Sequence, residues 1–301
     1  MENGRCEMKD SYIFFPLLFR RKGVKMKTNL TAVLSFASLV FFSCKDNPSE
    51  NYGYIQSADY LGRDGSVYQD HFATVDSLGD TLSNFYETIT LHLSTENQQI
   101  GEYPVSLKIL AQANPVSSSD SIVFAGSSGS NWYATTNDTV YAFAYQGIGP
   151  SLAFPKRGGI LKLQTSFNFD VPYALQKYFE TKNFDLDSIY LSEQKRAVYS
   201  LPLFVGKQWQ CFKSNYWFQR VRKVEGIENV TTKAGTFQCY KIRSSFTGDG
   251  FSPNEIWYDY ISKDGIILRT LQIIAEITTE DNPDGLGRAT MTERLELVSL
   301  K

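Results

Sequence analysis

Cysteine is the residue type in this sequence whose chemistry depends most on where the chain is located. Cys211 and Cys239 lie in the long stretch that follows the apolar N-terminal segment, 28 residues apart. In an oxidising compartment such an even pair predicts a disulfide. Both cysteines also lie among aromatic and strand-forming residues, where buried free thiols are common. We therefore expect a Cys211–Cys239 disulfide, with two buried free thiols as the alternative.

Other side chains suited to catalysis or metal binding are sparse. His71 lies among polar residues and His92 falls on the polar side of an alternating run, which favours solvated side chains over metal ligands or catalytic bases. Acidic residues are scattered, so none stands out as a pair for glycoside hydrolysis. No glycine-rich phosphate loop stands between a strand and a helix. We expect no catalytic residue, no metal site and no cofactor.

A short triplet recurs in which aspartate is followed by serine or threonine and then by an aliphatic residue. It resembles the O-glycosylation signal of some Gram-negative periplasms, and the resemblance implies modified hydroxyl groups. The alternative is that a polar turn running into a strand produces such triplets by itself. The hydroxyl residues concerned are Ser77, Thr81, Ser121, Thr139 and Ser188.

The N-terminal region has the order of segments found in a secretory signal. Two lysines precede an apolar run from Leu30 to Phe42, and Ser43 supplies a small residue at its end. The run is shorter than the roughly 20 apolar residues that a membrane-spanning helix needs. We therefore expect residues 1–43 to be a signal region that is removed, with Met26 as the true start of translation.

The junction behind this run is the expected site of lipid attachment. Residues 40–44, Val-Phe-Phe-Ser-Cys, resemble a lipobox, the sequence that lipoprotein signal peptidases recognise. The resemblance implies that Cys44 becomes a lipid-carrying N-terminus that attaches the chain to a membrane. The alternative is a plain signal peptide with a chance cysteine. Lys45 and Asp46 are similar to a surface-export signal of Gram-negative lipoproteins, and we expect an outer-membrane location facing either the periplasm or the surface.

Charge argues against nucleic acid as a partner. The chain has 30 basic and 32 acidic residues, and removal of residues 1–43 leaves 23 and 29. This acidic remainder has no basic stripe, so it has no electrostatic reason to bind nucleic acid or anionic lipid. A hydrophobic content of 42% and an aromatic content of 14% indicate a globular chain that buries a substantial core.

Period-two alternation of apolar and polar residues predicts strands in most of the chain behind a polar tether at 44–60. Ile89, Leu91 and Leu93 alternate with polar residues, and Met291, Leu295 and Leu297 indicate a last strand. Helices are expected only at Tyr173–Phe179 and Leu186–Arg196, and a flexible loop at Gly126–Asn131. We expect an N-terminal β-rich region at 61–200 and a C-terminal one at 201–301, with one continuous body as an alternative to two.

The C-terminal region contains the most specific motif. Gly-Lys-Gln-Trp at 206–209 is followed by VTTKAGTFQCYKI at 230–242, by Trp257-Tyr258 and by Asp264-Gly265. This string resembles uncharacterised β-domains of periplasmic proteins and lipoproteins, some of them similar to half-barrel lipoprotein carriers. The family has no agreed active site, so the resemblance implies an architectural motif. We expect Trp209, Phe237 and Trp257 to be buried, and Gly235 and Gly265 to lie in turns.

Clustered strands with few helices predict a mostly β fold of antiparallel sheet, as a half-barrel or a sandwich-like body with one or two short helices. The function expected first is that of a lipid-anchored, non-enzymatic envelope lipoprotein that binds a protein partner or takes part in an assembly. The alternative is a periplasmic-type carrier of an apolar ligand in a half-barrel cavity. An enzyme is the third hypothesis, and no residue supports it.

Overall fold

The computed structural model describes residues 59–118, 128–136, 138–156, 159–166, 188–213, 218–248, 255–276 and 288–301. Cys44, Ser121 and the helix expected at Tyr173–Phe179 lie outside these ranges. Within them, no helix is long and apolar enough to cross a membrane.

The described residues form thirteen strands and one short 3-10 helix, η2 (Asp59–Leu61). The strands are β1 (Val67–Asp76), β2 (Thr81–Glu96), β3 (Ser106–Ser118), β4 (Ser128–Thr136), β5 (Thr139–Lys156), β6 (Gly159–Ser166), β7 (Tyr190–Ser200), β8 (Gln208–Lys213), β9 (Phe218–Thr232), β10 (Gly235–Gly248), β11 (Ile256–Ser262), β12 (Gly265–Glu276) and β13 (Arg288–Ser299).

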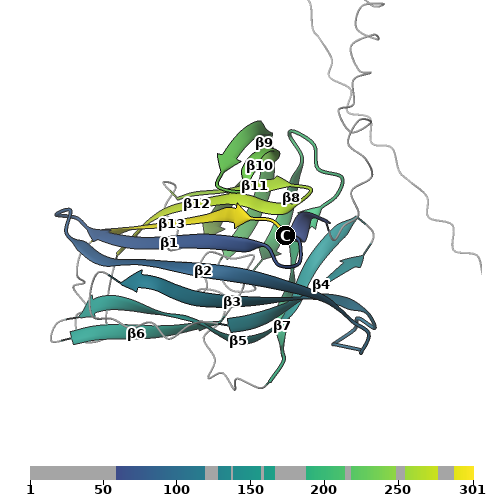
Figure 1. The fold of residues 1–301 in the computed structure, drawn as a ribbon, viewed down its shortest axis with the longest axis horizontal. Helices are drawn as coiled ribbons and strands as arrows, with labels where there is room; N and C mark the ends of the chain where they lie inside the picture. Colours follow the sequence, from purple (N-terminus) through teal and green to yellow (C-terminus); the bar gives the residue numbers. More distant parts are fainter. Residues whose placement is uncertain are drawn as a thin grey trace, which may run out of the picture. The chain divides into compact units, whose positions relative to one another are not determined.

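All thirteen strands belong to one antiparallel sheet, which confirms the expected fold class. Its order is β6-β5-β4-β3-β2-β1-β13-β12-β11-β10-β9-β8, and β7 pairs with β5. Most neighbours in the sheet are also neighbours in the sequence, as hairpin connections require. The exceptions are the pairing of β7 with β5 and the pairing of β1 with β13, in which Tyr68 lies opposite Leu297 (Figure 1). Through this pairing the sheet runs without a break from region 61–200 into region 201–301.

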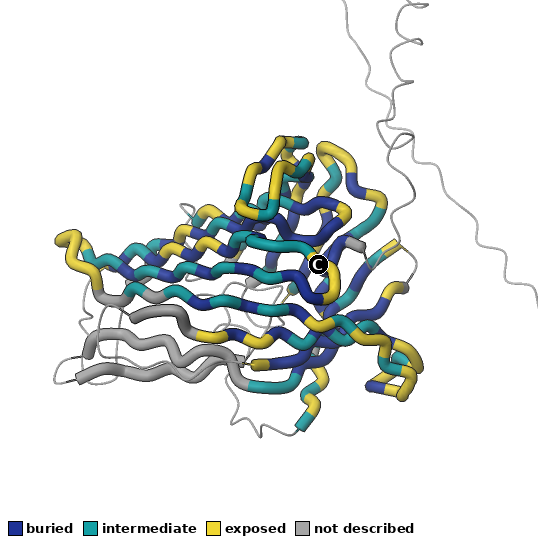
Figure 2. Tube along the Cα trace, viewed as in Figure 1, coloured by how far each residue is buried: buried dark blue, intermediate teal, exposed yellow. Residues whose placement is uncertain are grey.

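Alternation along the strands directs every second side chain into the interior. In β1 the residues Tyr68, Asp70, Phe72 and Thr74 are buried, whereas those between them are not, and β13 repeats this pattern from Ala289 to Leu297. The strands predicted around Leu91 and Leu295 are therefore confirmed as parts of β2 and β13. Exposed residues gather at the hairpin ends, and along the strands buried residues alternate with partly or fully exposed ones (Figure 2).

One hydrophobic core joins strands from both regions of the chain. Tyr68 of β1 belongs to the same buried cluster as Trp257 of β11 and Ile267 of β12. Strands distant in the sheet order also meet, because Nε1 of Trp209 in β8 donates a hydrogen bond of 2.9 Å to the carbonyl oxygen of Ala197 in β7. The sheet is thus folded over its own core.

Two local predictions are wrong. The helix expected at Leu186–Arg196 is replaced by β7, because hydrogen bonding to β5 outweighs the weak helical preference of this segment. The loop expected at Gly126–Asn131 contains the start of β4 instead, where Gly129 lies opposite Gly147. A Cβ atom on Gly147 would lie 2.4 Å from the backbone oxygen of Ser128. Glycine here permits a close approach of two strands.

Four of the five motif positions of the C-terminal region lie where they are expected, and one does not. Trp209 and Trp257 are buried as expected, at 8% and 1% exposure. Gly235 and Gly265 adopt φ values of 134° and 98° at the turns that lead into β10 and β12. Phe237, which was expected to be buried, is only partly buried and packs against the edge of the core.

Candidate functional site

The two cysteines expected to form a disulfide are free thiols, and both are buried. Cys211 lies on β8 and Cys239 on β10, with β9 between them. Their levels along β9 also differ, since Cys239 is opposite Glu228 whereas the neighbours of Cys211 are opposite Val221 and Arg220. A disulfide needs Cα atoms within about 7 Å of each other, so the expected bond is not formed. Burial raises the pKa of the Cys239 thiol to about 12, which disfavours the reactive thiolate.

The hydroxyl groups of the aspartate-containing triplets lie in different environments. Ser77 and Thr81 are exposed at the hairpin between β1 and β2. The Asp76 carboxylate accepts hydrogen bonds from two backbone amides of this hairpin, at 2.8 and 2.9 Å, so the triplet also forms a turn. The remaining three are Thr139 and Ser188, which are partly buried, and Ser121, which lies outside the described residues.

Neither histidine lies in the interior. The ring of His71 stacks on Tyr86 with centroids 4.1 Å apart, and its Nε2 atom is 2.7 Å from the Oδ1 atom of Asn84. His92 is exposed, with its Nδ1 atom 3.9 Å from the carboxylate of Asp64. Among the residues that the structure describes, no group of three or more His, Cys, Asp or Glu side chains could hold a metal ion.

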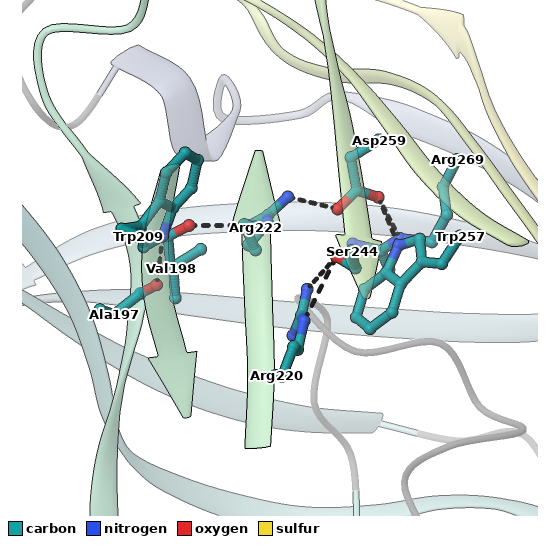
Figure 3. A network of polar contacts seen from close by, with 9 residues as sticks. All are labelled: Ala197, Val198, Trp209, Arg220, Arg222, Ser244, Trp257, Asp259 and Arg269. Carbon is teal, nitrogen blue, oxygen red and sulfur yellow. Dashed lines mark hydrogen bonds and ion pairs between the residues drawn. The ribbon is translucent and has the colours of Figure 1, made fainter. Parts of the chain in front are cut away.

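The main polar feature is a buried charged network in the C-terminal half of the sheet. It consists of Arg220 and Arg222 on β9, Asp259 on β11 and Arg269 on β12, each at most 2% exposed (Figure 3). These side chains point inward because they occupy the same alternate strand positions as the core residues. Asp259, for example, lies two residues from Trp257, which is buried on the same face.

Asp259 is the centre of this network. Its Oδ2 atom accepts a hydrogen bond from Nη2 of Arg222 at 2.5 Å, and its Oδ1 atom accepts one from Nε of Arg269 at 2.7 Å. Nε1 of Trp257 also donates to Oδ1, at 3.0 Å. Burial alone raises the pKa of Asp259, but the guanidinium groups of Arg269 and Arg222 outweigh it and hold the pKa below its ordinary value. The carboxylate is therefore ionised and fully engaged.

The arginines extend the network to strands on either side. Nη1 of Arg222 donates a hydrogen bond of 2.7 Å to the carbonyl oxygen of Val198 in β7. Arg220 donates from Nε and Nη2 to Oγ of Ser244 in β10, at 3.3 and 3.2 Å, and its guanidinium lies 3.6 Å above the centre of the Trp257 ring. Through Arg222 the network connects β7 to β9 and β11, so it reinforces the folded-over arrangement of the sheet.

A group of buried carboxylates lies on the same face of the sheet. Asp70 of β1 is opposite Glu87 of β2, and Glu293 of β13 is opposite Phe72 of β1; all three acids are at most 4% exposed. Burial, followed by the charges of Glu293 and Glu87, raises the pKa of Asp70 well above its ordinary value. Among the described residues, the Oδ1 atom of Asp70 has no hydrogen-bond partner.

The two charged groups lie close to one another. Across the sheet, Asp70 is opposite Leu295, which is opposite Arg269, so two strand spacings of about 4.8 Å separate the acid from the arginine. Such an array can orient strands and hold charge in the interior. Neither of the described histidines lies within it.

The sequence prediction did not include these residues, although a signal exists for them. Asp259 and Arg269 occupy inward positions of alternating runs, between Trp257 and Ile261 and between Ile267 and Leu271. A charge at such a position must be paired in the interior. The pairing partner, however, follows only from the order of the strands.

Comparison with known proteins gives a partial family match. A family model described as DUF3108-like matches residues 217–267, which extend over β9, β10 and β11 and include the whole of the network except Arg269. No curated protein matches the chain.

Two solved structures are similar to the chain over most of its length. One is an exported protein with a YmcC-like fold from Bacteroides fragilis, with 11% identity and a TM-score of 0.30, covering 80% of this chain and 98% of that chain. The other is a lipoprotein from Parabacteroides distasonis, with 12% identity and a TM-score of 0.31, covering 81% of this chain and 98% of that chain.

Proposed function

We propose that the chain is a lipoprotein of the bacterial cell envelope, held to a membrane by lipid on Cys44, whose β body binds a partner or forms part of an assembly. The observation that carries this proposal is the order of segments at the N-terminus, in which basic residues, a short apolar run and Ser43-Cys44 follow one another. The fifteen residue steps from Cys44 to Asp59 can span at most about 50 Å, so this segment can serve as a tether.

The composition of the interior supports binding at the outer surface over carriage of an apolar ligand. Inward positions that would face such a ligand are occupied by the buried charged network and by Asp70, Glu87 and Glu293. An apolar ligand beside these buried charges would offer them no polar atom, so this interior suits such a ligand less well than a purely apolar one would. The proposal accordingly assigns neither a carrier cavity nor a catalytic step to the chain.

Lipidation is tested by feeding cells an alkyne-labelled fatty acid. The wild-type chain is expected to become labelled and to fractionate with outer membranes, whereas Cys44→Ala is expected to lose the label and the membrane association together. Ser49→Ala, which lies outside residues 40–44 and leaves the cysteine in place, is the control for a general export defect. Equal label in the wild type and in Cys44→Ala would contradict the proposal.

We also propose O-linked glycans on the triplet hydroxyls, first on Ser77 and Thr81, because a transferase needs an exposed hydroxyl and both are exposed. The intact mass of the protein from its native host is expected to exceed that of the lipidated polypeptide. Ser77→Ala combined with Thr81→Val is expected to remove most of the excess. A wild-type mass equal to that of the lipidated polypeptide would contradict this part of the proposal.

A further inference from the structure

Two adjacent apolar side chains are exposed on the turn between β7 and β8. Phe204 is 45% exposed and Val205 is 51% exposed, whereas Leu203 beside them is buried in the core. Isolated exposed apolar residues are common on protein surfaces, whereas two adjacent ones on a turn form a small apolar patch that is suited to a contact outside the folded body.

The turn is rigid, so this exposure does not result from a loose segment. The backbone amide of Lys207 donates to the carbonyl oxygen of Phe204 at 3.0 Å, and the amide of Gly206 donates to the carbonyl oxygen of Val224 at 2.8 Å. The amide of Val224 returns a bond of 2.9 Å to the carbonyl oxygen of Lys207. These bonds and the buried Leu203 hold Phe204 and Val205 outward.

A lysine accompanies the two apolar side chains. The Nζ atom of Lys207 lies 5.5 Å from the centre of the Phe204 ring and donates a hydrogen bond of 2.9 Å to the carbonyl oxygen of Pro202. An aromatic ring beside a lysine, with the amine held at the base of the turn, matches the membrane interface, where rings enter the apolar boundary and amines stay among the headgroups.

The turn lies close to the point where the tether enters the body. Tyr60 of η2 packs against Tyr199 near the end of β7, with ring centroids 5.9 Å apart. Tyr199 is two residues before Leu201, where the turn begins. The described chain therefore begins beside this strand end, and a membrane that holds a lipid on Cys44 would be within the tether's reach of the turn, which favours a bilayer over a distant partner.

We propose that Phe204 and Val205 dip into the surface of the membrane that carries the lipid on Cys44 and so fix the orientation of the β body on it. This inference rests on the proposed lipidation. The neighbouring charges are of both signs, Lys207 on the turn and Asp138, whose carbonyl oxygen accepts a hydrogen bond from the amide of Leu201. The contact is therefore apolar, and it depends little on salt or on anionic lipid.

An environment-sensitive fluorophore on a single cysteine tests this contact. Val205→Cys carries the probe in the lipidated full-length protein, and Leu78→Cys is the matched control, since Leu78 is 85% exposed at the tip of the β1–β2 hairpin. This tip lies at the other end of β1, about 30 Å along the strand from the end next to η2. Cys211 and Cys239 are buried, so they do not react in the folded protein.

The labelled proteins are incorporated into vesicles of phosphatidylethanolamine and phosphatidylglycerol. The probe at residue 205 is expected to shift its emission to the blue, to be quenched by nitroxide on the lipid chains and to be shielded from aqueous iodide. The probe at residue 78 is expected to stay in water. Addition of Phe204→Ser to the Val205→Cys protein is expected to reduce the quenching by lipid.

The outcomes separate this inference from the proposed function. A protein that does not float with the vesicles and takes up no fatty acid contradicts the lipidation on which both proposals rest. A protein that floats while its probe at residue 205 remains as accessible to iodide as the probe at residue 78 contradicts the membrane contact alone. Shielding that appears only when envelope proteins are added would identify a protein partner and would likewise overturn the membrane contact.

Discussion

Asp259 shows at the scale of one residue how the interior of the sheet tolerates charge. Its carboxylate is 1% exposed and accepts hydrogen bonds from Arg222, Arg269 and Trp257. Ion pairs in such surroundings add little net stability, because both charges lose their hydration. Removal of one partner is costly, since it leaves the other charge buried and uncompensated.

We therefore expect Asp259→Asn to lower the free energy of unfolding by about 3–5 kcal/mol, the usual range for breaking a buried pair from one side. The matched control is Glu228→Gln, which breaks the pair with Lys241, an ion pair of 2.9 Å in which Glu228 is 48% exposed. Its expected cost is about 0–1 kcal/mol. Urea denaturation at neutral pH measures both variants, and similar small losses for the two would show that Asp259 is not the centre of a buried network.

Asp70 predicts that the stability of the protein falls as the pH rises. Its raised pKa means that the folded state binds the proton more tightly than the unfolded state does. The stability that results is fully present below the unfolded-state pKa of about 4 and is lost as the pH rises through the higher folded-state pKa. Asp70→Asn removes this loss while it keeps the shape of the side chain.

The variant Asp70→Asn is accordingly expected to be more stable than the wild type at pH 7, by on the order of 1 kcal/mol or about 2–4 °C in Tm. Below about pH 4 the two proteins are expected to converge. Thermal melts over a pH series measure the effect, with Asp138→Asn as the control at an exposed carboxylate. A difference in Tm between wild type and Asp70→Asn that stays constant at all pH values would contradict the raised pKa of Asp70.

At this scale the sequence predicts large apolar residues better than charged ones. The burial of Trp209 and Trp257 follows from their size and from their positions in alternating runs. Phe237 has the same pattern but lies near the β9–β10 turn, where the core ends. Asp259 and Arg269 could not be paired from the sequence, since the register of β11 against β12 brings them together.

At the scale of elements, two turns contain glycines with a positive φ whose surroundings differ. Gly265 begins β12 with a φ of 98°, and a Cβ atom there would lie 2.5 Å from the Cα atom of Gly62. Gly206 has a similar φ of 92°, but a Cβ atom on it would meet no other atom within 4 Å. The two positions thus differ in packing, but a residue with a Cβ atom would be strained at both of them.

This difference gives a matched pair of substitutions. Gly206→Ala is expected to cost about 1–2 kcal/mol, the strain of a positive φ in a residue with a Cβ atom. Gly265→Ala is expected to cost clearly more, because the backbone of η2 and the turn must also separate. Chemical denaturation compares them. If the two variants lose equal stability, the close approach of Gly62 to Gly265 does not constrain the fold.

Strands with regular alternation are easier to predict from the sequence than irregular strands. Period-two runs identified β2 and β13, because one face of each is buried. The segment at Leu186–Arg196 lacks clear alternation and was predicted as a helix, yet it pairs with β5 as β7. That pairing is irregular, with register shifts on both sides of Ala142, so the local sequence does not show it.

At the scale of the whole sheet, the pairing of β1 with β13 joins the two halves of the chain. Val67 lies opposite Ser299, so the partners are separated by most of the described sequence. Alternation tells which face of a strand is buried but not which strand lies beside it. The fold class was therefore predictable from the sequence, whereas a single sheet through both regions and the buried charged network were not.

The proposed attachment of the protein to a membrane depends on its N-terminus. The mass of the N-terminal peptide tests this attachment most directly. Protein purified gently from its native envelope is digested, and the peptide that contains residues 44 onward is measured by mass spectrometry. We expect a peptide that begins at Cys44 and carries a thioether-linked diacylglycerol. A peptide that begins at another residue, or an unmodified Cys44, would contradict the proposal of a lipid-anchored envelope protein.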